Sequence, residues 1–494
     1  MGLGDNTSSS SSSDEGERET RHHSRAGGGR GARKSQAILP RPSASSGGWL
    51  CFLMPLAFAT RYLHTPPCDA TADLHKLLTV AATGICVETL CFFVYMFVDT
   101  GILIKCLISL LPGAITSVIY VVALDTSWAY ALAAGFLITV LYQHCYICVL
   151  RALPYTFSFG EAAVLVQGLV LFVLNATYRL YELLVLETKP LSDFDQLNAI
   201  MLNALISLLI FCVLLAVVRP LRKPVPFYLS LAVLAVVVTC TPVTKPLPLI
   251  ALLNFIFREQ KRLNILVFYF TLVGLTAATV GWQLRNSRRA STRVRKIFHL
   301  LIDLVFIPGI VYQCALLYIS TGIALAVFTV LELFRLLEVP PFAARLKDAF
   351  NSFKDEKDAG RLALTPFCLL IGCSLPIWLT PCPCDAVAAG NTLALLSGIL
   401  AVGVGDTAAS VVGSKLGRIK WGKSNRSVEG TIAFVVSVLL ATLLLQLTGF
   451  LPMTQAKWFA TVFAALNTGL VEAFTDQVDN LVLPLIFYIL VGLA

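Results

Sequence analysis

Long apolar segments alternate with short polar loops from residue 77 to the end of the chain. Most of these segments are about twenty residues long, which lets a helix cross the roughly 30 Å hydrocarbon core of a bilayer. A membrane barrel would need short strands of alternating polarity, and the pattern lacks them. The predicted spans are 77–99, 101–124, 127–150, 161–187, 198–218, 226–243, 263–284, 297–316, 317–337, 362–380, 386–412, 430–450, 457–474 and 481–494. Two shorter apolar runs, 49–60 and 247–257, bring the prediction to about fourteen to sixteen transmembrane helices.

The composition supports this fold class and divides the chain into three parts. Of the 494 residues, 57% are hydrophobic and 14% charged, so we predict an all-α, polytopic membrane protein. Residues 1–48 are rich in Ser, Gly and Arg and are predicted to form a disordered tail. Residues 49–284 carry few intramembrane charges, apart from Arg179 and Glu182, which we expect to pair. We expect this region to shape a lipid groove and residues 285–494, where polar residues concentrate, to hold the functional site.

The basic charge of the chain lies mainly in loops. The net charge is +9, and it lies largely in the loops at residues 219–223, 258–262, 285–296 and 415–426. Membrane proteins keep loops rich in Lys and Arg in the cytoplasm. The charge therefore predicts an orientation and gives no reason to expect a nucleic-acid partner.

Four polar clusters in the C-terminal region are predicted to meet at one face of the membrane. They occupy residues 292–303, 353–361, 401–431 and 472–480. Two predicted spans separate each neighbouring pair, so all four emerge on the same side. The basic charge of two of them makes that side cytosolic.

The cluster at 401–431 places Asp406 inside an apolar run. We expect Gly405 to end one backbone segment, and Asp406 or Thr407 to cap a new helix whose free amides face an anion. On that helix Asp406, Ser410, Gly413 and Gly417 would share one face and let a ligand approach closely. The alternative for Gly413 and Gly417 is close packing against another helix.

A basic loop follows directly. Its cations and the small or acidic residues after them are Lys415, Arg418, Lys420, Lys423, Arg426, Ser427, Glu429, Gly430 and Thr431. Such a loop can bind lipid head groups. Together with an intramembrane carboxylate it favours a nucleoside triphosphate, which needs cations for its oxygens and an acid for the bridging divalent metal ion. The sequence contains no Walker, protein-kinase or Rossmann phosphate loop.

The other two charged clusters offer further candidate ligands. Glu472, Asp476 and Asp479 are spaced to share one helical face, beside Asn480, and either bind a cation or mark a solvated helix end. On the helix after residue 292, Arg295, His299 and Asp303 are predicted to share a face, so that Asp303 orients the imidazole. Arg295, with Lys296 beside it, would reach a phosphate. Residues 339–361 are predicted to form an amphipathic surface helix.

Several motifs of the C-terminal region resemble those of one enzyme family. "RKIFHL", "KDEKDAG", "SLPIWL", "LAVGVGDTAASVVGSKLG", "EGT" and "EAFTDQVDNLVLPL" occur in the order and spacing of the dolichol kinases, which are CTP-dependent polyprenol kinases of the endoplasmic reticulum. The resemblance covers about residues 290–494, and before it only "YTFSFGEAA" (155–163) matches. Phytol kinases and CTP-using phosphatidate cytidylyltransferases are similar more distantly.

The resemblance implies a role for the segment at about 401–431 in CTP binding on the cytosolic face. The positions that match the family there are Gly405, Asp406, Ser410, Gly413, Gly417, Glu429, Gly430 and Thr431. The loop departs from the family in lacking a Lys pair before "EGT", which leaves Lys423 and Arg426 to share that role. Glu472, Asp479 and Asn480 match the family, whereas Asp303 and Asp476 do not belong to its pattern.

The implied reaction transfers the γ-phosphoryl group of CTP to the terminal hydroxyl of dolichol and gives dolichyl phosphate for protein glycosylation. We expect Asp406 and Asp479 to hold a divalent metal ion, Mg²⁺ or Ca²⁺, and a carboxylate (Asp479 or Glu472) or His299 to take the alcohol proton. The cations expected on the phosphates are Lys415, Lys420, Lys423 and Arg426. The alternatives are a CTP-dependent phospholipid cytidylyltransferase and, as a third class, a transporter. The sequence gives no prediction of the oligomeric state.

Overall fold

The computed structural model describes residues 38–42, 44–64, 72–98, 101–186, 192–286, 292–355, 357–422 and 424–493. These residues belong to one compact unit, Ile38–Ala494. Every regular element within them is a helix, and the one isolated β-bridge described joins Lys420 and Ser427. The prediction of an all-α fold is confirmed.

The elements follow one another with short connections. In chain order they are η1 (Gly48–Phe52), α1 (Leu53–His64), α2 (Ala72–Phe97), α3 (Ile102–Leu124), α4 (Trp128–Ala152), α5 (Phe159–Tyr181), η2 (Glu182–Leu186), α6 (Asp193–Val217), η3 (Arg219–Arg222), α7 (Pro224–Cys240), α8 (Pro248–Phe257), α9 (Gln260–Arg285), α10 (Thr292–Tyr312), α11 (Cys314–Leu336), α12 (Ala343–Phe353), α13 (Leu364–Leu379), α14 (Pro383–Ala388), η4 (Ile399–Asp406), α15 (Thr407–Leu416), α16 (Val428–Leu447), α17 (Gln455–Phe474) and α18 (Asp479–Val491).

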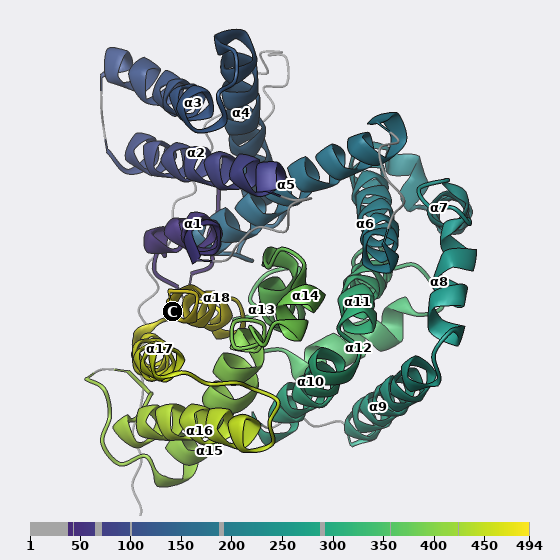
Figure 1. Ribbon diagram of the computed structural model, residues 1–494, viewed down its shortest axis with the longest axis vertical. Coiled ribbons are helices and arrows are strands. Elements are labelled where there is room, and N and C mark those ends of the chain that lie inside the picture. Colours follow the sequence, from purple (N-terminus) through teal and green to yellow (C-terminus); the bar gives the residue numbers. More distant parts are fainter. Residues whose placement is uncertain are drawn as a thin grey trace, which may run out of the picture. The chain divides into compact units, whose positions relative to one another are not determined.

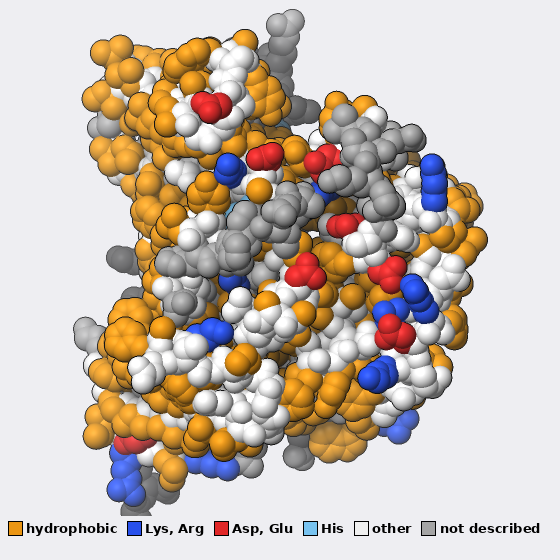
Figure 2. Space-filling model, in the orientation of Figure 1, with side chains coloured by type: hydrophobic (Ala, Val, Ile, Leu, Met, Phe, Trp, Pro, Cys, Tyr) orange, Lys and Arg blue, Asp and Glu red, His pale blue; other side chains and the backbone are white. Residues whose placement is uncertain are grey.

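Within the described ranges, nine helices are long and apolar enough to cross a membrane, and five shorter apolar helices accompany them. Large hydrophobic side chains remain exposed along α3, α7, α9 and α16, as on helices that face lipid. Figure 2 shows a face covered mostly by hydrophobic side chains, with few charged ones. The prediction of a polytopic membrane protein is confirmed. The predicted amphipathic surface helix is also present, as α12, which buries none of its residues.

Two groups of helices pack closely in the N-terminal and C-terminal parts of the unit. Helices α2, α3 and α4 pack against one another, and α5 continues from them to α6 (Figure 1). In the C-terminal part α16, α17 and α18 lie side by side, and α13 packs against α18. The π-helix η4 contacts α10, α13, α15, α16, α17 and α18 and forms the centre of this second group.

The predicted break at Gly405 is wrong. Helix η4 continues directly into α15, and the Thr407 amide donates to the Val404 carbonyl, so it does not face an anion. Glycines here serve close packing: a Cβ atom on Gly403 would lie 1.7 Å from an Asp303 carboxylate oxygen. Tertiary packing on the bare backbone overrides the low helix propensity of glycine.

The glycines after Asp406 also contact neighbouring helices. A Cβ atom on Gly417 would lie 2.5 Å from the Ser427 hydroxyl, and one on Gly413 would lie 3.0 Å from the same oxygen. On Gly430 it would lie 3.0 Å from the Ala409 carbonyl. The space beside these residues is filled where α15 crosses α16, as the packing alternative predicts.

The predicted single helix through Glu472, Asp476 and Asp479 is also wrong. Helix α17 ends at Phe474, and residues 475–478 form a loop before α18 begins at Asp479. A carboxylate is favourable in the first turn of a helix, which suits this start of α18. The three acids therefore do not share one helical face. Of the three, Glu472 and Asp479 contact the same cation, Arg426.

Residues 38–42 and 44–47, which lie inside the predicted disordered tail, are packed against the helices. Arg41 is only 2% exposed because it pairs with the buried Glu161 of α5. The tail prediction is wrong for this segment. Composition does not reveal that a polar segment has buried partners far along the chain.

Candidate active site

Asp406, the intramembrane acid at the end of η4, is paired with a lysine. It is 3% exposed, and Lys296 from the first part of α10 forms an ion pair with one of its carboxylate oxygens. The Lys296 ammonium also lies 3.5 Å from the Asp406 carbonyl oxygen. A carboxylate with so little exposure stays ionised only beside a partner of opposite charge, and Lys296 is that partner.

His299 lies one turn further along α10. Its Nε2 is 3.5 Å from the paired oxygen of Asp406 and 3.3 Å from the side-chain oxygen of Asn480 on α18. The imidazole thus connects η4 to α18. Its other nitrogen, Nδ1, has no hydrogen-bond partner among the described residues.

Arg426 joins the basic loop to the two acids that flank residues 475–478. Its guanidinium lies 2.8 Å from Glu472 and 3.0 Å from Asp479. Burial disfavours the charged guanidinium, but the two carboxylates outweigh it and raise the pKa of Arg426 above its ordinary value. Lys357 approaches Asp479 from the other side at 2.8 Å.

Lys357 belongs to the polar segment 353–361. Asp355 of the same segment pairs with Arg295 of α10 at 2.5 Å. All four polar segments predicted to meet are therefore in contact. We call this group the charged cluster; its members are Arg295, Lys296, His299, Asp355, Lys357, Asp406, Arg426, Glu472, Asp479 and Asn480. Within the described residues it balances four Lys or Arg cations against four carboxylates.

Local hydrogen bonds hold the two loops that contribute to the charged cluster. Asp358 accepts hydrogen bonds from the amide and hydroxyl of Thr365, both at 2.9 Å, and so fixes the turn that carries Lys357. In the basic loop Glu429 accepts from the Arg418 amide at 3.0 Å. The Trp421 amide donates to the Arg426 carbonyl at 3.1 Å, which sets the backbone beneath the guanidinium.

The remaining predicted phosphate ligands lie away from the charged cluster. Lys415 and Lys420 are exposed, and the Lys420 ammonium donates to the Asn425 carbonyl at 2.9 Å. Lys423 lies outside the described residues. Arg426 is thus the loop cation that the structure brings to the buried acids.

The hydroxyl residues predicted to bind a nucleotide bond mainly to their own segment. Ser427 caps α16 by accepting from the Gly430 amide at 3.1 Å. Thr431 accepts from the Trp421 indole at 2.9 Å, and Thr407 lies 3.4 Å from the Val402 carbonyl. The Ser410 hydroxyl, half-buried on α15, makes no hydrogen bond among the described residues.

Asp303 does not orient His299 as predicted. Asp303 Oδ1 has no hydrogen-bond partner among the described residues, and it faces Gly403 of η4. The imidazole contacts Asp406 and Asn480 through Nε2 instead. Helical spacing places side chains on one face, but it does not decide which of them bond. Asp476 likewise points away from the charged cluster, toward Ser45.

Sequence reasoning missed Lys357 and Asp355 as members of this site. Both lie in "KDEKDAG", which was interpreted as the end of a surface helix. The signal was a dense pairing of opposite charges in a short turn at a membrane boundary. Their partners, Asp479 and Arg295, lie far from them in sequence, so the pairing was not evident.

The charged cluster does not form a complete metal site by itself. Among the described residues, no group of three or more His, Cys, Asp and Glu side chains is placed to hold a metal ion. Asp406 and Asp479 are instead paired with cations. Mg²⁺ commonly takes one or two carboxylates and completes its shell with water and phosphate oxygens. Two acids alone would therefore leave most of the shell to water and phosphate oxygens.

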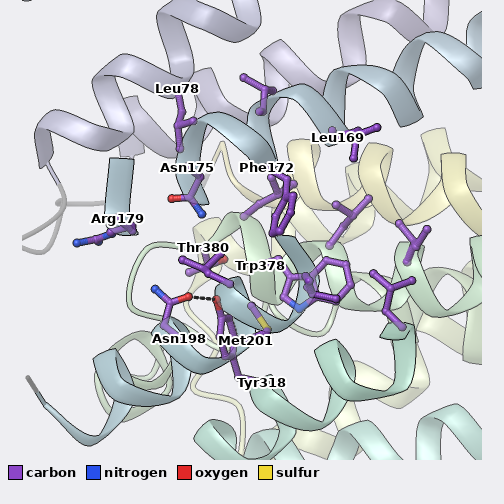
Figure 3. Close-up of a pocket in the computed structure, with 18 of the residues that line it drawn as sticks. Leu78, Leu169, Phe172, Asn175, Arg179, Asn198, Met201, Tyr318, Trp378 and Thr380 are labelled. Carbon is purple, nitrogen blue, oxygen red and sulfur yellow. Dashed lines mark hydrogen bonds between the residues drawn. The ribbon is translucent and has the colours of Figure 1, made fainter. Parts of the chain in front are cut away.

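A second feature is an apolar cavity of about 420 Å³ between α1, α2, α5, α6, α11 and α13. Figure 3 shows Leu169, Phe172 and Trp378 along its wall, with the polar Asn175 and Arg179 toward one end. Arg179 pairs with Glu182 at 3.4 Å, as predicted. Leu481, two residues after Asp479, also lines the cavity.

Comparisons with known proteins agree on one family. The model of the family "Dolichol kinase" matches residues 76–369. Dolichol kinase of Mus musculus is 31% identical over 442 residues, covering 84% of this chain and 79% of the relative, and that of Homo sapiens is 32% identical over 438 residues with the same coverage. Dolichol kinase EVAN of Arabidopsis thaliana is 35% identical over 250 residues, covering 50% of this chain and 43% of the relative. No solved structure matches. The chain belongs to the dolichol kinase family.

Proposed function

We propose that this protein transfers the γ-phosphoryl group of CTP to the terminal hydroxyl of dolichol and produces dolichyl phosphate for protein glycosylation. It would act in the endoplasmic reticulum membrane, with its site facing the cytosol. Family membership supports dolichol phosphorylation. The observation that carries the site assignment is the buried Asp406, paired with Lys296 in a cluster of balanced charges.

The cations of the charged cluster are suited to phosphate oxygens. Lys296, Lys357 and Arg426 come from three separate segments and converge on two acids. In the free protein these acids hold the cations in place. The cations are therefore in position before a triphosphate binds. The phosphate oxygens would then replace the carboxylates as partners of some of these cations. The exposed Lys415, Arg418 and Lys420 would add positive charge along the nucleotide's path.

Asp406 and Asp479 are the residues we assign to a divalent metal ion, which would neutralise the negative charge that develops on the phosphate oxygens. Asp406 is buried at the end of η4, and Asp479 is half-buried at the start of α18. Each of them is paired with a Lys or Arg side chain in the free protein. They can then exchange a cation partner for the metal ion when the cations bind phosphate.

His299 is the side chain we assign as general base. Glu472 and Asp479 are both engaged by Arg426, whereas His299 Nδ1 has no hydrogen-bond partner among the described residues. Asp406, 3.5 Å from Nε2, would stabilise the imidazolium formed after proton transfer. Nδ1 is the nitrogen left to accept the alcohol proton.

The cavity is the site we assign to part of the polyisoprenoid chain. Its walls come largely from α1, α2, α5 and α6, the region expected to shape a lipid groove. Apolar side chains dominate the wall, and Leu481 links it to the helix that begins with Asp479. A lipid alcohol could then keep its chain in an apolar site while its hydroxyl reaches the charged cluster.

The decisive experiment follows the phosphates of CTP. Purified protein is incubated with dolichol and CTP labelled either at the γ- or at the α-phosphate. Transfer of γ-label to the lipid, with none from the α-position, is the expected result. Incorporation of α-label would assign a cytidylyltransferase, and lipid movement without nucleotide turnover would assign a transporter. A parallel reaction with γ-labelled ATP tests the preference for CTP.

A further inference from the structure

The described residues of the N-terminal segment, 38–42 and 44–47, contact the start of α5 and the loop that precedes Asp479. Backbone hydrogen bonds join this segment to the residues that precede α5. The Arg41 amide donates to the Phe157 carbonyl at 2.9 Å, and the Tyr155 amide donates to the Leu39 carbonyl at 2.7 Å. Contact is close: a Cβ atom on Gly160 would lie 1.8 Å from the Gly47 carbonyl oxygen. The N-terminal segment is therefore a fixed part of this region.

Arg41 and Glu161 form a buried ion pair at 2.5 Å, and both side chains are 1% exposed. Glu161 makes further bonds with the same carboxylate. It accepts the Ser158 amide at 2.9 Å as part of a capping box on α5, and the Val478 amide at 2.8 Å. Arg41 also donates to the Asp476 carbonyl at 3.3 Å. The pair thus holds both α5 and the loop at 475–478.

Other bonds from the same two segments hold the rest of this loop. Ser45 donates to the Asp476 carboxylate through its amide at 2.7 Å and its hydroxyl at 2.9 Å. The Ser158 hydroxyl bonds to Gln477 Oε1 at 2.5 Å. Residues 476 to 478 are therefore each hydrogen-bonded by residues outside α17 and α18. Asp479 follows them directly in the chain.

We infer that Arg41 and Glu161 are positioning residues for phosphoryl transfer, which fix the Val478 backbone and thereby aim Asp479 between Lys357 and Arg426. The inference rests on the proposed function, since Asp479 is assigned there. Val478 is only 2% exposed, so its amide needs a protein acceptor, and Glu161 supplies it. A buried ion pair is weak evidence for stability alone, because apolar residues can often replace it. The bond to Val478 is what ties this pair to the site.

Two double variants separate positioning from stability. Arg41→Met with Glu161→Met removes the charges and the acceptor for the Val478 amide, and an apolar pair of similar volume is compatible with folding. Arg41→Gln with Glu161→Gln also removes the charges but keeps an amide oxygen for Val478. We expect both proteins to be monodisperse and folded at the assay temperature, with a lower melting temperature for the Met pair because its Val478 amide has lost its acceptor. The Met pair should lose about tenfold or more in kcat with an unchanged KM for dolichol, whereas the Gln pair should stay within about threefold.

A control comes from an ion pair outside the charged cluster. Glu259 pairs with Arg262 at 2.7 Å at the start of α9. Glu259→Gln should leave kcat unchanged. Equal kcat for the folded Met pair and the parent protein would overturn the inference. A similar loss of kcat in Glu259→Gln would also overturn it, because loss of an ion pair outside the charged cluster would then have the same effect.

Hydrogen exchange gives a readout that needs no reaction. Amides of residues 475–482 should exchange faster in the Met pair than in the parent protein, and at the parent rate in the Gln pair. Unchanged exchange in the Met pair would overturn the positioning role. If the parent protein transfers no γ-label, the proposed function fails, while the exchange result still decides whether Arg41 and Glu161 hold this loop.

Discussion

The charged cluster and the apolar cavity are both internal sites, but they are built in opposite ways. Side chains of the charged cluster come from both helices and loops, and each ion has a specific partner, such as Lys357 with Asp479. The cavity is lined by several helices, mostly with apolar side chains that need no specific partner. The cluster should therefore respond to isosteric changes of charge, and the cavity only to changes of volume.

The largest effect is expected for Asp406→Asn. The change keeps the shape of the side chain but removes the charge that pairs with Lys296, and we expect kcat to fall by about 10²–10³-fold. The measurement is γ-label transfer from CTP to dolichol. Asp385→Asn, in the exposed first turn of α14, is the control and should be neutral. Full activity of Asp406→Asn would remove this residue from the site.

The next largest effect separates a buried cation from a loop cation. Lys296→Met should lower kcat/KM for CTP by about 10- to 100-fold, because it removes a charge-assisted contact in a buried place. Lys420→Met should change it by less than about threefold, since Lys420 is exposed and bonds to its own loop. Titration of activity against CTP measures both. An effect of Lys420→Met as large as that of Lys296→Met would move the phosphate site into the basic loop.

The cavity is tested by two neighbouring residues on α6. Leu209 lines the cavity, whereas Ile210 is 55% exposed on the outer surface. Leu209→Trp should raise the KM for long-chain dolichol by about tenfold and leave kcat nearly unchanged, because the indole takes space from the lipid chain. A short prenol should be less affected. If Ile210→Trp gave the same increase, the cavity would not be the chain site.

The smallest effect concerns Asp476, whose carboxylate bonds to Ser45 outside the charged cluster. Partial burial disfavours its ionised form, but the hydrogen bonds from Ser45 outweigh this and hold the pKa of Asp476 below its usual 3.8. Its ionised form therefore stabilises the fold above about pH 3.8, and this contribution is lost as the pH falls through the lower folded pKa.

Asp476→Asn should accordingly lower the melting temperature by about 1–2 °C at pH 7, with a difference that shrinks below pH 3.8. Melting curves of both proteins across this pH range make the measurement. A difference that stays constant down to the lowest pH would show that ionisation of Asp476 does not stabilise the loop.

Much of the charged cluster was predictable from the sequence, because the cost of placing ions in a bilayer makes each such residue conspicuous. Asp406, Lys296 and His299 stand out in apolar or boundary segments, and the even number of spans between clusters predicted one common face. The partners were harder to predict. Periodicity placed Asp303 beside His299, yet Asn480 from another helix makes the contact.

The sequence by itself determined the all-α membrane fold, the regions of the site and the family, because hydropathy and local motifs are properties of short segments. Only the tertiary structure decided that the helix continues past Gly405, that Lys357 faces Asp479, and that Arg41 is buried against Glu161. Each of these depends on residues that are distant in the chain. Their contacts form when helices pack, since a buried ion or amide must then find its partner in whichever segment lies beside it.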